Sequence, residues 1–257
     1  MDKIQRQREH FNRVAGRYRS ARKDTNHLLL KSLIWSDFLE PHSKLKKQGL
    51  SVLEAMCGFA DGKSIIETAL EISTDYSGFD YSDEVIATLK NDQPEIKVFH
   101  ADAGSVELTK EYDLILLLGG LHHVPHIAED VVARLAKAIK PGGYFINLEP
   151  TNGNALFSWI RRKIYQRNSL FDEKTERAFD VLELESFFTG AGLRSIDTTY
   201  PGLSAYVLYY NPDAFPWLNL GGEWMVKSAF RLDTLFSRNI VGRKLSFATL
   251  SLWQKDL

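Results

Sequence analysis

The chain has 257 residues, of which 44% are hydrophobic and 25% charged, the proportions of an ordinary soluble globular protein. This composition excludes intrinsic disorder, collagen-like repeats and a disulfide scaffold, and a net charge of −1 gives no overall attraction for nucleic acid. The single cysteine, Cys57, excludes an intramolecular disulfide and a cysteine-based zinc site, and it fits a reducing compartment.

No apolar run approaches the roughly 20 residues that a membrane-spanning helix needs. Residues 1–19 carry charges throughout and lack the apolar segment of a secretory signal. The sequence therefore predicts a cytoplasmic protein.

Short apolar runs alternate with helical patterns in the middle of the chain, which is typical of β-α-β units and a parallel sheet. The predicted strands cover residues 51–54, 75–80, 97–100, 112–118 and 144–148. Helices are predicted over residues 62–71, 83–91 and 129–139, the last closed by Pro141, Gly142 and Gly143.

After Pro150 the alternation ends. Helices are predicted over residues 154–166, 182–188 and 223–236, and strands over 195–200 with the following 205–210, and over 247–254. The late strands approach as a hairpin and add an antiparallel edge strand to the sheet.

The linkers are too short for an independent second domain, so residues 1–257 are predicted to form one doubly wound, Rossmann-like α/β domain with seven strands. Its core covers residues 48–150, 193–210 and 246–257, and a helical lid is drawn from residues 1–40, 151–190 and 211–245.

In an open parallel sheet, ligands bind beyond the carboxyl ends of the strands. Glu54 ends the first predicted strand, and the turn Ala55-Met56-Cys57-Gly58 follows; its glycine lets the backbone approach a ligand, although the turn equally suits a structural role. Asp80 follows the second strand, where a carboxylate can accept hydrogen bonds from a ribose diol. Ser82 and Asp83 are better placed to cap the next helix, which leaves Asp80 for a ligand.

Two further segments follow the third and fourth strands. Asp102 is placed to accept a hydrogen bond from an adenine amino group, although a lone aspartate is more often a turn residue. Gly119 and Gly120 open space for a ligand. Three histidines come next, but adjacent histidines in one loop rarely converge on an ion and no acidic residue or cysteine completes the site, so no metal is predicted at His122, His123 and His126.

Taken in series, these segments and Lys140-Pro141-Gly142-Gly143 resemble the class I S-adenosylmethionine (SAM)-dependent methyltransferases, in particular their small-molecule branch. The resemblance covers residues 51–149, and extends loosely to the N-terminal helix and the final strand. It implies SAM as the methyl donor, with S-adenosylhomocysteine as the product. The residues it implies for cofactor binding are Glu54, Ala55, Cys57, Gly58, Asp80, Tyr81, Asp102, Ala103, Gly119 and Gly120.

By the same resemblance, Glu54 orients the turn and reaches the methionine amino group of SAM, while Asp80 holds the ribose hydroxyls and Tyr81 flanks the adenine. Asp102 and Ala103 contact the adenine, and the two glycines bound the methionine portion.

One departure concerns the turn after the first strand. The family has glycines where this chain has Met56 and Ala60, so only Gly58 of the three remains. Methionine is predicted to require an ordinary negative φ at position 56. A nicotinamide-binding Rossmann protein needs those glycines for a pyrophosphate that SAM lacks, so the departure weighs more heavily against an oxidoreductase.

Methyl transfer from a sulfonium requires positioning, exclusion of water and, for a hydroxyl acceptor, removal of a proton. Histidine, with an unperturbed pKa of about 6.5, is a suitable base, and His122 or His123 is the candidate. The alternative is that the pair shapes the loop. Glu149, at the end of the fifth strand, is a second candidate base.

Basic residues gather in the predicted lid, at residues 6–22 and 161–167. A solvated face explains them, and so does an anionic sugar or lipid acceptor or peripheral contact with a membrane. A small-molecule methyltransferase is the leading interpretation; a non-catalytic SAM-binding protein and a nicotinamide-dependent oxidoreductase are the alternatives. Nucleic-acid methylation is disfavoured, because Gly119-Gly120-Leu121-His122 stands where an Asn-Pro-Pro-Tyr motif would be expected.

Overall fold

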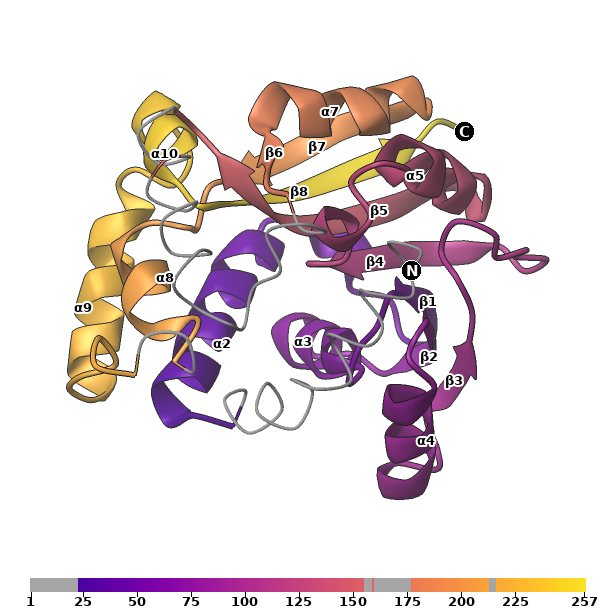
Figure 1. The fold of residues 1–257 in the computed structure, drawn as a ribbon, viewed down its shortest axis with the longest axis horizontal. Coiled ribbons are helices and arrows are strands. Elements are labelled where there is room, and N and C mark those ends of the chain that lie inside the picture. The colour runs from indigo at the N-terminus through magenta and orange to yellow at the C-terminus, as the bar shows by residue number, and fades with distance from the viewer. Residues whose placement is uncertain (1–22, 155–158, 160–176, 213–215) are drawn as a thin grey trace.

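The computed structural model describes residues 23–154, 159, 177–212 and 216–257. Its centre is a mixed sheet with the strand order β3-β2-β1-β4-β5-β8-β7, and a short strand, β6, pairs with β5 off this path (Figure 1). Neighbours among β1 to β5 are parallel, whereas β8 is antiparallel to both β5 and β7. The predicted fold class, a mostly parallel doubly wound sheet with an antiparallel edge, is confirmed.

The strands are β1 Leu50–Ala55, β2 Thr74–Asp80, β3 Lys97–His100, β4 Tyr112–Leu118, β5 Ile139–Asn152, β6 Phe179–Asp180, β7 Leu193–Thr199 and β8 Ala248–Lys255. The α-helices are α2 Thr25–Leu39, α3 Asp61–Leu70, α4 Asp83–Asp92, α5 Ala128–Lys137, α7 Val181–Gly190, α8 Ser204–Tyr209, α9 Glu223–Thr234 and α10 Ile240–Leu245. Two short 3-10 helices are η1 Ser43–Leu45 and η2 Leu121–His123. The strand β5 starts at Ile139 and not, as predicted, at residue 144. Its register with β4 shifts between Tyr112 and Leu114, so the predicted turn at Pro141, Gly142 and Gly143 is an irregularity within the strand.

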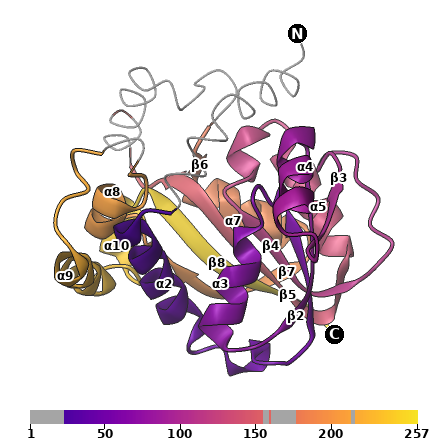
Figure 2. The same cartoon turned by 90° about the horizontal axis from the view of Figure 1, so that it is seen from below.

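The alternation of side chains along the central strands builds a separate core on each face of the sheet. On β4, Leu114 and Leu116 join the core formed with α2, α3, α4 and α8, whereas Ile115 and Leu117 join the core formed with α5 and α7. Figure 1 shows α5 and α7 above the sheet and α2 and α3 below it, and Figure 2 looks at the sheet from the side of α2 and α3. A strand segment buried on both faces has to be apolar, as residues 114–118 of β4 are.

The prediction of a strand over 205–210 is wrong, because this segment forms α8. Asp233 on α9 accepts hydrogen bonds from the backbone N–H groups of Ser204 and Ala205 and from the Ser204 hydroxyl, at 2.6–3.1 Å. These bonds satisfy donors in the first turn of the helix. A cap supplied from a distant helix thus overrides the β propensity of the tyrosines and valine in α8.

The helix predicted over 154–166 and the first 22 residues of the predicted lid lie almost wholly outside the described residues. The division into a core and a lid therefore stays a prediction. Within the described ranges, no helix combines the length and the apolar character needed to span a bilayer.

Candidate active site

The first three predicted acidic residues lie at the same edge of the sheet. Register pairs Glu54 on β1 with Gly78 on β2, and beyond β1 the Cys57 N–H donates to the Phe79 carbonyl at 2.8 Å. Beyond β3, the Ala101 N–H donates to the Asp80 carbonyl at 3.0 Å. The loops that carry Glu54, Asp80 and Asp102 therefore leave neighbouring strands at their carboxyl ends, next to the point where strand order reverses between β1 and β4.

Glu54 ties the end of β1 to the start of α3. Its carboxylate is 2% exposed, accepts the Gly62 N–H at 3.0 Å and accepts the hydroxyl of Tyr76. Burial raises the pKa of this carboxyl to about 8, and the nearby charge of Asp61 adds to the rise, while the bond from Tyr76 opposes it. A Cβ at position 62 would lie 2.6 Å from Oε2 of Glu54, so this close approach requires glycine.

Every second residue from 56 to 60, in the turn after β1, has a positive φ: Met56 at 53°, Gly58 at 51° and Ala60 at 60°. The prediction of a negative φ at Met56 is wrong. The turn is held by bonds from the Cys57 N–H to Phe79 and from the Gly58 N–H to Asp80, so the backbone follows a glycine-type path although two of the residues are not glycine. Each left-handed L-residue costs about 1–2 kcal/mol, a strain that persists only where the surroundings enforce it.

Asp80 accepts the backbone N–H of Gly58 with one carboxylate oxygen and that of Ser82 with the other, both at 2.9 Å. Desolvation raises its pKa, and these bonds together with the charge of His123 oppose the rise. Ser82 is the N-cap of α4, as the sequence predicts, with its hydroxyl accepting the Val85 N–H at 3.3 Å.

Asp102 and Tyr81 flank Asp80. One oxygen of Asp102 accepts the Gly104 N–H at 2.8 Å and its carbonyl accepts the Val106 N–H, so this aspartate closes a turn. Ala103 is buried next to it. The Tyr81 ring lies 5.9 Å from the His100 ring, centroid to centroid, at the same edge of the sheet.

The loop after β4 is organised around a fully buried carboxylate, Glu149 of β5. Glu149 Oε1 accepts the N–H groups of Gly120 and Leu121, each at 2.8 Å, and Oε2 accepts the His122 N–H at 3.3 Å. The same Oε2 lies 2.9 Å from Nδ1 of the His122 ring. A backbone loop and one imidazole are thus oriented by a single side chain.

The loops after β1 and β4 meet at Gly120. A Cβ at this position would lie 2.8 Å from Sδ of Met56, and Gly119 has a φ of +74°. The ring of His123 lies against that of His122, with centroids 4.0 Å apart and an interplanar angle of 37°. The structure therefore brings the candidate base and the residues predicted to hold the cofactor to one edge of the sheet. Across the described residues, no group of three or more His, Cys, Asp or Glu side chains could hold a metal ion.

Tyr76 and Gly62 contribute to the site and were not predicted from the sequence. Tyr76 stands two residues before Gly78, on the same face of β2, so the register of β1 against β2 was needed to place its hydroxyl at Glu54. Gly62 was assigned only as a helix start.

The geometry fits an adenosine with an amino-acid tail. Among the described residues, no atom lies within 4 Å of a Cβ built at Gly58, so this part of the structure leaves the backbone accessible to a ligand. A carboxylate has about four acceptor sites, so Asp80 keeps acceptor capacity beyond its backbone bonds, which suits a diol.

Residues 52–143 match the family model of a methyltransferase domain. The demethylmenaquinone methyltransferase of Lysinibacillus sphaericus (strain C3-41) is 24% identical over 178 residues, which are 62% of this chain and 75% of that protein. The phthiotriol/phenolphthiotriol dimycocerosates methyltransferase of Mycobacterium tuberculosis is 27% identical over 114 residues, 43% of this chain and 42% of that protein. An S-adenosylmethionine-dependent methyltransferase structure from Mesorhizobium loti shares the fold with a TM-score of 0.53 and 15% identity, covering 84% of this chain and 97% of that one.

The fold, the order of the motifs and the methyltransferase-domain match over residues 52–143 are those of the class I SAM-dependent methyltransferases. The matched domain and the methyltransferase relatives support an enzyme that uses SAM as its methyl donor.

Proposed function

We propose that this enzyme transfers the methyl group of SAM to a hydroxyl or similarly ionisable group of an apolar small molecule, with His122 as the general base. The observation that carries the proposal is the pair formed by His122 and the buried Glu149 at the carboxyl end of the sheet.

On the cofactor side, the proposal gives Asp80 the ribose hydroxyls and Glu54 the amino group of the methionine tail. Tyr81, Asp102 and Ala103 line the adenine side. The backbone at Ala55, Cys57, Gly58, Gly119 and Gly120 bounds the rest. An ammonium group beside Glu54 would favour the ionised carboxylate, which burial otherwise disfavours, so binding of the tail would release a proton from Glu54.

On the acceptor side, Glu149 accepts the hydrogen bond of Nδ1 and so selects the imidazole tautomer that carries its lone pair on Nε2. The acceptor hydroxyl gives its proton to Nε2 as its oxygen takes the methyl group, and Glu149 stabilises the imidazolium that forms. When bound, SAM supplies a methyl group already activated by its sulfonium. The remaining task of the chain is to position the acceptor and exclude water.

Glu149 is not the base in this scheme. It is fully buried and already accepts three backbone N–H groups and one imidazole, so it acts as a positioning residue. His123, which lies close enough to Asp80 to affect its pKa, is assigned to the cofactor side.

The names of two relatives support an apolar acceptor. The relatives named above methylate, by their names, demethylmenaquinone and phthiotriol dimycocerosates. These names guide the acceptor panel. A base oriented by a buried carboxylate favours an enzyme over a non-catalytic SAM-binding protein.

Calorimetry with SAM and S-adenosylhomocysteine tests the cofactor site. We expect dissociation constants on the order of micromolar, at least about a hundredfold weaker binding for Asp80→Ala because a diol would lose its charged acceptor, and unchanged binding for Asp83→Ala, whose side chain is exposed on the adjacent helix. Equal affinity of Asp80→Ala and the wild type would contradict the site.

Radiolabelled SAM with a panel of phenolic, quinol, alcohol, amine and carboxylate acceptors tests the chemistry. Transfer to hydroxyl acceptors that rises with their apolar character supports the proposal. Transfer confined to amines or carboxylates would refute the assignment of the acceptor group while leaving the cofactor site intact.

A further inference from the structure

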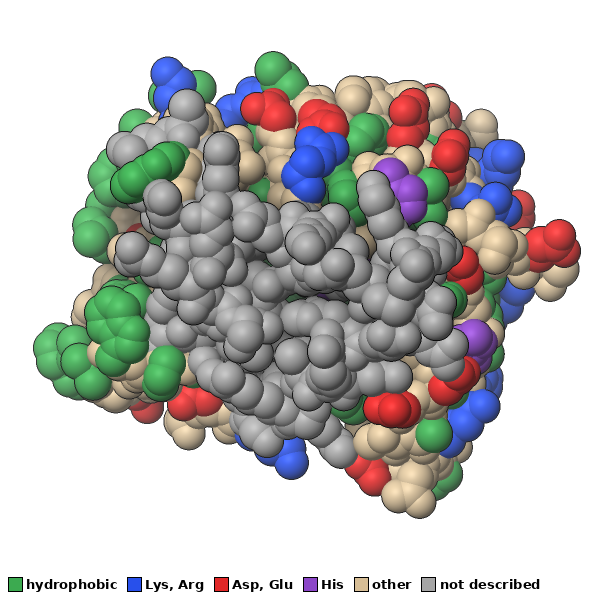
Figure 3. Space-filling model, in the orientation of Figure 1, with side chains coloured by type: hydrophobic (Ala, Val, Ile, Leu, Met, Phe, Trp, Pro, Cys, Tyr) green, Lys and Arg blue, Asp and Glu red, His purple; other side chains and the backbone are tan. Residues whose placement is uncertain are grey.

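A band of large apolar side chains is exposed on one edge of the molecule. We call this band the outer face. Its side chains are each more than half exposed, and they lie on α9, on α10 and in the segments next to these helices. They are Trp217, Leu220, Trp224, Leu232, Leu235 and Ile240. In the space-filling view, hydrophobic side chains gather at the left, over α9 and α10 (Figure 3). Contiguous apolar patches of this kind mark interaction surfaces.

The exposed apolar side of α9 is distinct from the side that packs against the rest of the protein. The inward side of this helix is already occupied by the buried residues Val226 and Asp233, and Asp233 caps α8. The outward side instead carries Trp224, Leu232 and, just after the helix, Leu235. α9 therefore has a filled inner side and an apolar outer side.

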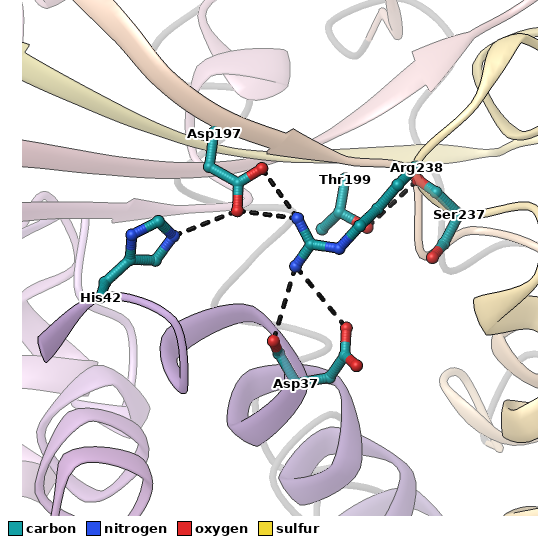
Figure 4. A network of polar contacts seen from close by, with 6 residues as sticks. All are labelled: Asp37, His42, Asp197, Thr199, Ser237 and Arg238. Atoms are coloured by element: carbon teal, nitrogen blue, oxygen red, sulfur yellow. Dashed lines mark hydrogen bonds and ion pairs between the residues drawn. The ribbon is translucent and has the colours of Figure 1, made fainter.

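The segment that joins α9 to α10 is fastened to the rest of the fold by a polar network, drawn in Figure 4. The Arg238 guanidinium donates to both oxygens of Asp197 on β7, at 2.7 and 2.8 Å, and lies 3.7 Å from a carboxylate oxygen of Asp37 on α2. His42 Nε2 lies 3.1 Å from Asp197, and the carbonyl of Ser237 accepts the Thr199 hydroxyl. The outer face is thus presented on a fixed support.

Two unpaired cations accompany the outer face. Of the five basic residues in 216–246, Lys227 pairs with Glu223, Arg238 with Asp197 and Asp37, and Arg243 with Glu185, which leaves Arg231 and Lys244. Among the described residues, neither Arg231 nor Lys244 has an acidic partner, and both are exposed. A rigid face with two exposed tryptophans, aliphatic side chains and free cations matches an anionic lipid surface, because aromatic rings favour the headgroup level and cations favour anionic headgroups.

We infer that the outer face docks the enzyme on an anionic lipid bilayer, with its apolar side chains at the boundary of the acyl chains and Arg231 and Lys244 at the headgroups. This inference depends on the geometry of α9 and α10 and not on the identity of the methyl acceptor.

Vesicle flotation with the full chain tests the inference, comparing phosphatidylglycerol-containing vesicles with pure phosphatidylcholine. We expect binding to the anionic vesicles that weakens as salt is raised from 0.1 to 0.5 M, because screening shortens the range of charge attraction. The triple variant Trp224→Ser, Leu235→Ser, Ile240→Ser should bind at least about tenfold more weakly, since it removes three inserting side chains. The variant Arg231→Glu, Lys244→Glu should lose its preference for the anionic vesicles.

Matched controls lie elsewhere on the surface. Leu182→Ser on α7 removes an equally exposed apolar side chain, and Lys137→Glu on α5 reverses an exposed charge; both should leave vesicle binding unchanged. Thermal unfolding of each variant verifies that the fold is intact.

Two results would overturn the inference. One is that the wild type fails to float with anionic vesicles. The other is that sedimentation analysis shows a dimer which the triple variant dissociates, while vesicle binding is the same for both; the outer face would then be covered by a second copy of the chain.

Discussion

Two buried glutamates lie at the edge of the sheet that carries the candidate active site, and they differ in how many hydrogen bonds they accept. Glu54, near the end of β1, accepts one backbone N–H and one tyrosine hydroxyl, and burial raises its pKa to about 8. Glu149, on β5, accepts three backbone N–H groups and the ring of His122.

This difference shows how the same residue type serves two tasks. A buried carboxyl with few donors stays protonated near neutral pH and gains from a cationic ligand. A carboxyl surrounded by donors is already stabilised by its own chain and is suited to hold other groups in place. On the proposed assignment, a ligand completes the loop after β1, whereas the loop after β4 is already held by Glu149. Four substitutions test this contrast, from the largest expected effect to the smallest.

The largest effect is expected from His122→Asn. Removing a general base lowers the rate of methyl transfer about 10²–10⁴-fold, and SAM affinity should stay unchanged because Asp80 and Glu54 are untouched. Single-turnover kinetics with labelled SAM, together with calorimetry, separate the two readouts. His123→Asn is the matched control and should change SAM affinity more than the rate; a larger rate loss in His123→Asn than in His122→Asn would reverse the assignment.

Glu54→Gln should stabilise the cofactor-free protein at neutral pH. The carboxyl of Glu54 has a pKa of about 8 in the folded protein and of 4.5 when it is exposed. Between these pH values the folded state binds one proton more than the unfolded state. The free energy of unfolding of the wild type therefore falls as the pH rises from 4.5 to 8. Glutamine imitates the protonated form, so the gain at pH 7 is on the order of 3 kcal/mol.

Urea unfolding from pH 5 to 9 measures this effect. The variant should lose the decline over that range and should also bind SAM more weakly. A wild type whose stability does not change between pH 5 and 8 would show that Glu54 is ionised in the folded state.

Glu149→Gln should act in the opposite direction. The amide offers one acceptor oxygen to four donors, so bonds to a buried charge are lost and stability falls by about 2 kcal/mol, with a lower rate of methyl transfer because the His122 tautomer is no longer selected. Measured at pH 7 beside Glu54→Gln, the two isosteric variants should shift the urea midpoint in opposite directions. A shift of equal sign would remove the distinction between the two glutamates.

Met56→Gly should produce the smallest effect, a gain of about 1 kcal/mol from relief of the left-handed backbone, reduced by the greater freedom of glycine in the unfolded chain. The matched control is Glu71→Gly, because Glu71 also has a positive φ and its side chain is exposed. Thermal unfolding measures both. A loss of stability in Met56→Gly alone would mean that packing of its side chain on Gly120 outweighs the backbone strain.

The sequence predicted what depends on local pattern and missed what depends on distant partners. The predicted strand 112–118, with its apolar run 114–118, and the cap at Ser82 are local signals, and both match the structure. The φ of Met56 depends on bonds to β2, and the helix α8 depends on a cap from Asp233, 28 or 29 residues further along the chain.

The same limit applies within the candidate site. His122, His123 and Glu149 were all candidates for the base because each follows a strand end. Their roles separate only when the hydrogen bonds are known, since the pairing of Glu149 with His122 Nδ1 joins residues 27 positions apart. A sequence pattern identifies the residue types that gather at an edge; it does not say which of them hold each other.

The position of β8 also has a consequence for biosynthesis. In the described sheet β7 has only β8 as a neighbour, yet the residues of β8 are numbered 248–255 and those of β7 193–199. At translation rates of about 5–20 residues per second, several seconds separate the synthesis of these strands. During that interval β7 has no strand to pair with, and the edge of β5 that pairs with β8 is exposed. The nascent chain should therefore depend on chaperones until β8 emerges from the ribosome.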